Sequence, residues 1–187
     1  NYYRISVKRE AGSNNPDGMI SNRLHDHVVE GDPIELSAPA GTFVLNNSTA
    51  ARKIFISGGV GQTPLLAMLE NLILNQEQTE VPITWIHGCR NEDVHAFRNK
   101  VSELSSTYAN MDQHIFYEQL TAQQNTAYQG WVDLELLKEN VLETEAEYYI
   151  CGPAPFITKH YHFLMENGVQ KTSIYFEEFG PASLQLN

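Results

Sequence analysis

The chain contains a strongly apolar segment that runs into a glycine-rich turn and then into a helix-forming segment: Ile54-Phe55-Ile56-Ser57-Gly58-Gly59-Val60-Gly61-Gln62-Thr63-Pro64. Its first half has the pattern of a buried strand, and a threonine followed by a proline is typical of a helix start. Glycines let a phosphate approach the main chain, and a helix N-terminus presents amides with partial positive charge. Open α/β sheets bind nucleotides at such turns. The segment matches neither the Rossmann fingerprint nor the P-loop, so a tight connection without a ligand is the alternative.

Strand-like and helix-like segments alternate from about residue 52 to the end of the chain. Strand–helix alternation at this spacing predicts an α/β fold, with a five-stranded parallel nucleotide-binding sheet and helices on both of its faces. Gly168 suits a left-handed cap at the end of the last helix. The predicted strands are Lys53–Ser57, Ile83–His87, His114–Glu118, Glu147–Cys151 and Ser173–Phe176, and the predicted helices are Pro64–Leu74, Ala96–Tyr108, Leu134–Asn140 and Phe156–Glu166.

The N-terminal quarter has a different pattern, made of short strands and turns. Tyr3, Ile5 and Val7 alternate with polar residues, which predicts a strand with one solvated face. A short helix is expected from about Ser21 to Val28. Further strands are expected at Ile34–Ser37 and Phe43–Leu45, so this part predicts an antiparallel sheet or a small barrel.

Composition excludes several classes of function. The 187 residues include 12 basic and 23 acidic side chains, a net charge of −11, so no basic surplus exists to bind nucleic acid or an anionic membrane surface. No apolar run is long enough to span a membrane. Cys89 and Cys151 are too few for a disulfide framework or a four-cysteine iron–sulfur cluster, which favours a reducing, cytoplasmic setting. His25 and His27, like His160 and His162, are two residues apart on predicted helices, so no metal site is expected.

Two more motifs stand at the ends of predicted strands. Tyr148-Tyr149-Ile150-Cys151-Gly152-Pro153 repeats the strand, glycine and helix-start pattern on what is expected to be an adjacent strand. Its thiol is expected to face the same crevice, although a small buried cysteine is the commoner fate. Tyr175-Phe176-Glu177-Glu178-Phe179-Gly180-Pro181 ends a strand in paired carboxylates and an aromatic ring. That ending can border a planar cofactor or can be a solvated strand end.

Together these motifs resemble the ferredoxin-reductase-like superfamily, and more narrowly the reductase region of flavohaemoglobins (nitric oxide dioxygenases). The resemblance covers nearly the whole chain, from Tyr3 to about Pro181. The matching stretches, in addition to the three above, are Tyr3-Arg4-Ile5-Ser6-Val7-Lys8-Arg9-Glu10, Ile20-Ser21-Asn22-Arg23-Leu24-His25, Gly31-Asp32, Ala38-Pro39-Ala40-Gly41 and Val94-His95-Ala96-Phe97.

The resemblance implies that a β-barrel holds FAD and the α/β domain holds NAD(P)H, with hydride transfer where they meet. It implies that Glu177 lies beside the flavin and tunes its redox potential. It also implies these cofactor contacts: Met19, Ile20 and Ser21 at the FAD pyrophosphate, Gly59, Val60, Gly61, Gln62, Thr63 and Pro64 around NAD(P)H, Cys151, Gly152 and Pro153 along the nicotinamide, and Glu178, Phe179, Gly180 and Pro181 at the isoalloxazine.

The same resemblance implies a domain plan and a partner. Residues 1–48 are expected to form part of an antiparallel FAD-binding β-barrel whose N-terminal strands are missing. Residues 49–187 are expected to form the NAD(P)H-binding domain with a C-terminal tail that contacts the flavin. The implied partner is an N-terminal globin domain of the same parent chain, which would carry haem and receive electrons for nitric oxide dioxygenation.

Cofactor preference and electron acceptor stay open at this stage. Arg90 follows the second predicted strand, where a guanidinium can pair with the 2′-phosphate of NADPH, and a solvated loop arginine is an equal alternative. A reductase that serves a ferredoxin or an oxygenase is one alternative function. A nucleotide-binding module without turnover is another.

Overall fold

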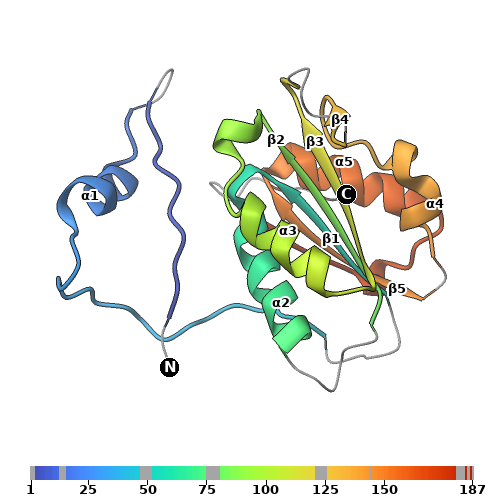
Figure 1. Ribbon diagram of the computed structural model, residues 1–187, viewed down its shortest axis with the longest axis horizontal. Coiled ribbons are helices and arrows are strands. Elements are labelled where there is room, and N and C mark those ends of the chain that lie inside the picture. The colour runs from blue at the N-terminus through green and yellow to red at the C-terminus, as the bar shows by residue number, and fades with distance from the viewer. Residues whose placement is uncertain are drawn as a thin grey trace. The chain divides into compact units, whose positions relative to one another are not determined.

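A parallel sheet of six strands, in the order β4-β3-β2-β1-β5-β6, forms the centre of the second part of the chain (Figure 1). The computed structural model describes residues 3–12, 16–46, 52–74, 81–120, 126–143, 145–179, 184 and 186. Every pair of neighbouring strands within this described part is parallel. The strands are β1 (Arg52–Gly58), β2 (Ile83–Cys89), β3 (Met111–Tyr117), β4 (Tyr128–Gln129), β5 (Ala146–Gly152) and β6 (Ile174–Glu178).

The predicted number of strands was wrong by one, because the described part of the sheet has six strands instead of five. The additional strand, β4, is two residues long and pairs Tyr128 with Phe116 and Gln129 with Tyr117 of β3. A two-residue strand has no periodicity that a sequence pattern can show. The ring of Tyr128 stacks on that of Phe116 at a centroid distance of 4.6 Å, which holds this short strand at the sheet edge.

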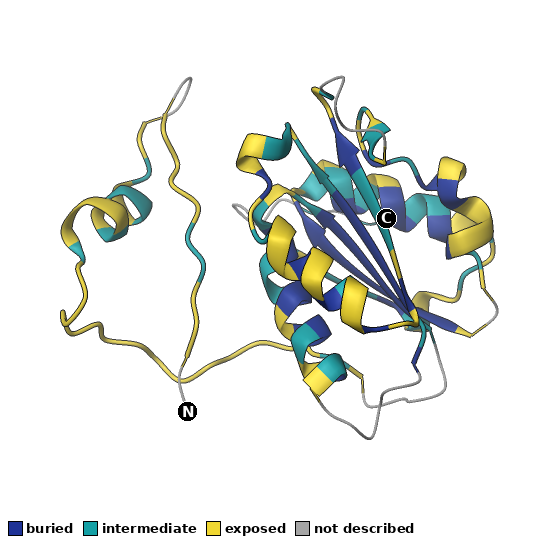
Figure 2. Cartoon of the chain, viewed as in Figure 1, coloured by how far each residue is buried: buried dark blue, intermediate teal, exposed yellow. Residues whose placement is uncertain are grey.

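Helices cover both faces of the sheet, as the alternating pattern predicts (Figure 1). On one face α2 (Gln62–Leu74) and α3 (Arg98–Thr107) pack on Phe55, Trp85 and Tyr149. On the other face α4 (Lys138–Val141) and α5 (Ala154–Glu166) pack on a layer that includes Ile54, Ile86 and Ile150. Residues of the central strands are therefore buried on both sides, as Figure 2 shows. Continuous apolar strands are typical of such two-sided parallel sheets.

The end of α5 was predicted correctly, whereas the start of α2 was not. Gly168 has a φ of +86°, its amide donates to the Met165 carbonyl, and the Val169 amide donates to the Leu164 carbonyl. These bonds confirm the left-handed cap after α5. The start of α2 was predicted two residues too late, because a 3-10 turn, η1 (Gly59–Gly61), leads directly into a helix that begins at Gln62.

A buried ion pair joins β1 to β5. The Nζ atom of Lys53 lies 2.5 Å from Oε2 of Glu147, and the hydroxyl of Tyr149 donates to the same oxygen at 3.1 Å. Asn46 completes the group, since its amide donates to the Tyr149 hydroxyl and its side chain to Glu147 Oε1 and Tyr175. These bonds hold Asn46 against the sheet.

The first 42 residues form a separate unit from residues 43–187. Its helix α1 (Met19–His27) confirms the short helix expected there. Arg9 ties the preceding segment to α1 through Asp26 at 2.7 Å and Asn22 at 3.2 Å.

No strand occurs in the described parts of residues 3–46, so the predicted strands at Tyr3–Val7, Ile34–Ser37 and Phe43–Leu45 do not form there. Within the part of the chain that the structure describes, none of these segments has a partner strand to hydrogen-bond with, and a single strand in water is not stable. The antiparallel barrel part is therefore not shown by this structure.

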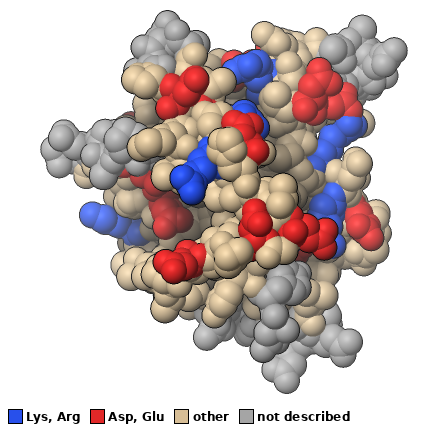
Figure 3. Space-filling view, turned by 90° about the vertical axis from the view of Figure 1, so that its left-hand side faces the viewer, with Lys and Arg blue, Asp and Glu red and all other residues tan. Residues whose placement is uncertain are grey.

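The surface carries charges of both signs. Figure 3 draws acidic and basic side chains scattered among other residues, without a large basic patch in view. Among the described residues, no helix combines the length and the apolar character that crossing a bilayer requires.

Candidate functional site

A row of paired residues crosses the sheet near the carboxyl ends of its strands. Ser57 of β1 pairs with His87 of β2 on one side and with Cys151 of β5 on the other, and Cys151 pairs with Glu177 of β6. Paired residues of parallel strands project from the same face of the sheet. The structure therefore brings residues of all three sequence motifs to one level of the sheet.

The turn after β1 rests directly on the end of β5. A Cβ atom on Gly61 would lie 2.2 Å from the carbonyl oxygen of Cys151 and 2.9 Å from the amide nitrogen of Gly152. No side chain fits there, so glycine is required for the two turns to meet. Because β1 is flanked by β2 on one side and β5 on the other, this meeting point is the topological switch point of the sheet.

The outer side of the same turn is open. Gly59 is exposed, has a φ of +56°, and a Cβ atom on it would meet nothing within 4 Å. Val60, Thr63 and Pro64 are half-buried beside it. Behind them Gln62 is buried, and its Oε1 atom has no hydrogen-bond partner among the described residues. An open glycine turn at the start of a 13-residue helix has the form of an anion-binding turn.

Phe156, in the first turn of α5, is a part of the site that the sequence analysis did not identify. A Cβ atom on Gly58 would lie 3.1 Å from its ring, and one on Gly152 would lie 2.9 Å from it. The ring of Phe156 therefore packs on both glycine turns, at Gly58 and at Gly152. A phenylalanine three residues after Pro153 is the sequence signal that could have found it.

Cys151 has no exposed surface, and it belongs to the apolar layer under α2 and α3. Burial raises the pKa of its thiol, and the nearby Glu177 carboxylate raises it further. The thiol therefore stays protonated at neutral pH. Its neighbour Pro153 is exposed, and the carbonyl of Gly152 accepts a hydrogen bond from the amide of Phe179.

The C-terminal motif lies beside these turns. Glu177 is exposed and Glu178 is half-buried, with its Oε2 atom accepting a hydrogen bond from the Leu184 amide at 3.1 Å. The side chain of Phe179 is 39% exposed. Gly180 and Pro181 lie outside the described residues.

The remaining predicted site residues lie elsewhere. Met19 and Ile20 are exposed in the first turn of α1, in the N-terminal unit. The Ser21 hydroxyl donates to the Gly18 carbonyl at 3.1 Å and accepts from the Glu10 amide at 3.2 Å. Arg90 is exposed just after β2, and its carbonyl oxygen accepts a hydrogen bond from the Gln119 amide.

Two buried histidines were also missed by the sequence analysis. The Nδ1 atom of His87 lies 2.8 Å from the Ser57 hydroxyl, and the ring of His95 lies 4.5 Å from that of His87. Burial lowers the pKa of His87 to about 3 and that of His95 to about 4, so both rings are neutral. The spacing of His87 and His95 along the sequence does not indicate that their rings are in contact.

Comparisons with known proteins agree with this geometry. Residues 55–161 match the family model of the oxidoreductase NAD-binding domain. The flavohem-like FAD/NAD-binding domain of nitric oxide dioxygenase from Vibrio cholerae O1 biovar El Tor is 34% identical, with a TM-score of 0.82 over 94% of this chain and 70% of that one. The chain belongs to the flavohaemoprotein reductases of the oxidoreductase NAD-binding family. This membership confirms the resemblance inferred from the motifs.

Other relatives of this reductase place it in a wider fold. A flavohemoprotein of Bacillus thuringiensis subsp. konkukian is 40% identical over an alignment of 186 residues that covers 97% of this chain and 46% of that protein. This reductase chain therefore spans about half the length of the curated relatives it matches. A ferredoxin NADP+ reductase from Neisseria gonorrhoeae shares the fold, with 20% identity and a TM-score of 0.70 over 88% of this chain and 71% of that one.

Proposed function

We propose that this chain is the reductase part of a flavohaemoprotein, in which NAD(P)H binds at the carboxyl ends of the sheet and passes hydride to FAD. The observation that carries the proposal is the contact between Gly61 and the backbone of Cys151 and Gly152. It joins two glycine turns into one open cradle at the switch point of an α/β sheet, where such sheets bind nucleotides.

The cradle residues Gly59 to Pro64 would hold the pyrophosphate of NAD(P)H. Gly59 leaves open space for the phosphate, and the first turn of α2 supplies amides that have no partner inside the helix. Cys151, Gly152 and Pro153 would border the nicotinamide. Since the Cys151 thiol is buried and protonated, its part is to shape this wall and not to act as a nucleophile.

The chemistry that FAD would supply is acceptance of a hydride from NAD(P)H and release of the electrons one at a time. Glu178 and Phe179, with Gly180 and Pro181 beyond them, would border its isoalloxazine ring. Glu177 is the exposed carboxylate at this strand end. A negative charge there disfavours an anionic reduced flavin, so Glu177 would tune the redox potential.

The N-terminal unit would supply the other part of the FAD site. The amides in the first turn of α1 have no partner within the helix, and Met19 and Ile20 beside them are exposed. This arrangement fits an anion such as the FAD pyrophosphate, with Ser21 holding the turn in shape. We assign residues 1–48 to an FAD-binding barrel part and residues 49–187 to the NAD(P)H-binding domain with its flavin-contacting tail.

In the whole protein, electrons would pass from FAD to haem on an N-terminal globin domain, where bound oxygen oxidises nitric oxide. Two findings support this step. The matched flavohemoproteins are about twice as long as this chain, and the Vibrio cholerae relative is named as part of a nitric oxide dioxygenase. We propose a cytoplasmic location as part of the same assignment.

The test of the cradle is a calorimetric titration with NADH that compares Gly59→Ala with Gly168→Ala. Both glycines have a left-handed φ, +56° and +86°, and both have open space around a Cβ atom, so the two variants bear the same kind of strain. We expect Gly59→Ala to weaken NADH binding on the order of tenfold and Gly168→Ala to leave it unchanged. Equal binding by the two variants would overturn the assignment.

The test of the flavin step is the visible absorption spectrum of the chain after incubation with FAD. A retained flavin peak that bleaches on addition of NADH supports hydride transfer by these residues. NADH binding together with a flavin peak that does not bleach would contradict a reductase and favour a nucleotide-binding module without turnover.

A further inference from the structure

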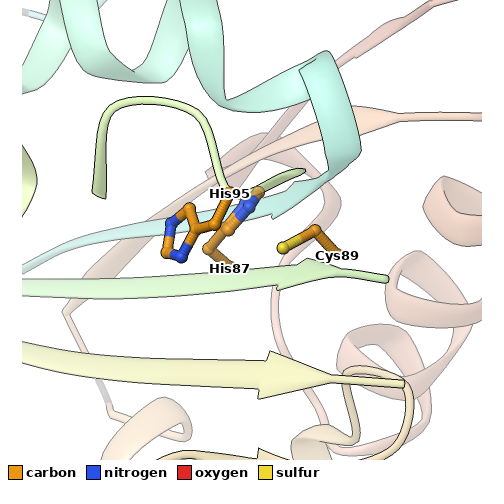
Figure 4. A group of neighbouring side chains, drawn as sticks. All are labelled: His87, Cys89 and His95. Atoms are coloured by element: carbon orange, nitrogen blue, oxygen red, sulfur yellow. The ribbon is translucent and has the colours of Figure 1, made fainter. Parts of the chain in front are cut away.

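Three potential metal ligands converge beside the cradle without being part of it. They are His87 in β2, Cys89 at the end of β2, and His95, which follows the 3-10 turn η3 (Glu92–Val94). One ring nitrogen of each histidine and the Sγ atom of Cys89 all lie within 4.8 Å of one another. Figure 4 shows the three side chains gathered at the end of β2.

The two histidines use their ring nitrogens in the same way. The Nδ1 atom of His87 lies 2.8 Å from the Ser57 hydroxyl, and the Nδ1 atom of His95 lies 2.8 Å from the Tyr117 hydroxyl. The Nε2 atoms of both rings are buried and have no hydrogen-bond partner among the described residues. An unpaired buried nitrogen is destabilising, and two of them side by side require an explanation.

We propose that His87, Cys89 and His95 bind a divalent transition-metal ion of the zinc type, with the two Nε2 atoms and Sγ as ligands. A set of two imidazoles and one thiolate suits Zn²⁺ or Co²⁺ and does not suit Mg²⁺ or Ca²⁺, which take oxygen ligands. Metal-bound histidines usually donate the other ring N–H to a fixed acceptor, which is the part that Ser57 and Tyr117 would play.

The three ligand atoms lie near the separation that a bound metal ion requires, and they must move slightly toward one another. Bonds of about 2.0 Å to nitrogen and 2.3 Å to sulfur place tetrahedral ligand atoms roughly 3.5 Å apart. Cys89 can make this movement, because it is only half-buried and its thiol, a weak donor, makes one hydrogen bond, 3.4 Å to the Asn91 carbonyl. On binding, the Sγ–H bond breaks, the proton passes to solvent, and the Sγ–metal bond forms.

An ion would enter from the side of His95. His95 lines an open pocket together with Glu92, Phe97 and Arg98. A metal ion reaching His95 from this side could keep a water molecule as its fourth ligand. His160 is also buried, but the described residues place no second ligand group beside it.

The test is a titration of the untagged, reduced chain with Co²⁺, followed by absorption spectroscopy. We expect one ion per chain, with a thiolate-to-cobalt charge-transfer band and visible bands of tetrahedral Co²⁺. Cys89→Ser is expected to abolish the charge-transfer band, and Cys151→Ser, which changes the other cysteine, is expected to keep it. His95→Ala is expected to weaken binding at least tenfold, and His160→Ala to leave it unchanged.

The conservative variant Tyr117→Phe tests the geometry without removing a ligand. Loss of its hydroxyl is expected to weaken Co²⁺ binding by about 10- to 100-fold, as found for other second-layer partners of metal ligands, while the far-ultraviolet circular dichroism stays that of the unchanged chain. The proposal is overturned by a Co²⁺ spectrum without a thiolate band, by a band that persists in Cys89→Ser, or by equal binding in His95→Ala and His160→Ala.

Discussion

The ammonium group of Lys53 and the carboxylate of Glu147 lie 2.5 Å apart between two central strands, and the Lys53 side chain has no exposed surface. A buried charge of this kind is tolerated only when it is paired and its remaining hydrogen bonds are satisfied. Tyr149 and Asn46 provide further bonds to the same carboxylate. The pair therefore sets the register of β1 against β5, on which the meeting of the two glycine turns depends.

Glu147→Gln is expected to lower the free energy of unfolding by about 3 kcal/mol or more, because it removes the carboxylate that lies 2.5 Å from the buried Lys53 ammonium. Urea denaturation followed by circular dichroism measures this loss. The control is Glu145→Gln, an exposed glutamate two residues away, with an expected change within about 0.5 kcal/mol. Equal stabilities of the two variants would contradict the structural role of the pair.

Gly61→Ala is expected to destabilise the protein by about 1–3 kcal/mol, because the added methyl group would overlap the β5 backbone, which cannot rotate away. The measurement is the midpoint of thermal unfolding. Gly41→Ala, in the N-terminal unit, serves as a control for backbone strain without overlap, since Gly41 has a φ of +122° and a Cβ atom there would meet nothing within 4 Å. A thermal midpoint for Gly61→Ala equal to that of the unchanged chain would show that the two turns are not in contact.

Stability is expected to fall in acid because of buried histidines. Burial lowers the pKa of His160 to about 3, against an ordinary value near 6.5. Between these values the unfolded chain binds a proton that the folded chain does not, so the stabilisation is complete above pH 6.5 and is lost as the pH falls toward 3. Each such histidine contributes a slope of about 1.4 kcal/mol per pH unit.

His160→Leu is the variant that checks this pH dependence. It removes two ring nitrogens that have no partner in the described structure, and it keeps an apolar group against Phe156. Urea unfolding at pH 4, 5 and 6 is expected to show a slope smaller by the contribution of one histidine. His27→Leu, which changes an exposed histidine, is expected to leave the slope as it was. A slope unaffected by His160→Leu would contradict its burial in a neutral form.

Arg90→Ala is expected to weaken NADPH binding by about tenfold and to leave NADH binding nearly unchanged, because an exposed guanidinium after β2 can pair with the 2′-phosphate, which NADH lacks. Dissociation constants for both dinucleotides, measured by protein fluorescence, give the comparison. Lys100→Ala removes another exposed cation and serves as control. An equal effect on the two dinucleotides, or none on either, would show that Arg90 does not read the 2′-phosphate.

The central strands β1 and β5 could be predicted because each contains a continuous apolar run bounded by helix signals. These runs, around Phe55 and around Tyr149, are both buried on two sides. The strand β4 could not be predicted, since two residues carry no pattern. The barrel strands were predicted from the alternation at Tyr3, Ile5 and Val7, but alternation shows only which face would be solvated. It does not show whether a partner strand is available.

Much of the candidate site could be predicted, because glycines after apolar strands mark the carboxyl edge of the sheet. Contacts that depend on the register of neighbouring strands could not be predicted. The pairing of Ser57 with His87 and the approach of His95 to the same point arise from how β2 and the following loop are placed. The contact of Phe156 with Gly58 and Gly152 depends in the same way on the path of α5.

The position of β1 between β2 and β5 has a consequence for how the protein is made. Lys53 and Glu147, which join β1 to β5, are 94 residues apart along the chain. A ribosome therefore synthesises the first glycine turn long before the strand that forms its other wall. Contacts of such high sequence separation form late and slowly. The nascent domain passes through a stage in which β1 has only one neighbour and its other edge is open to pairing with a foreign chain.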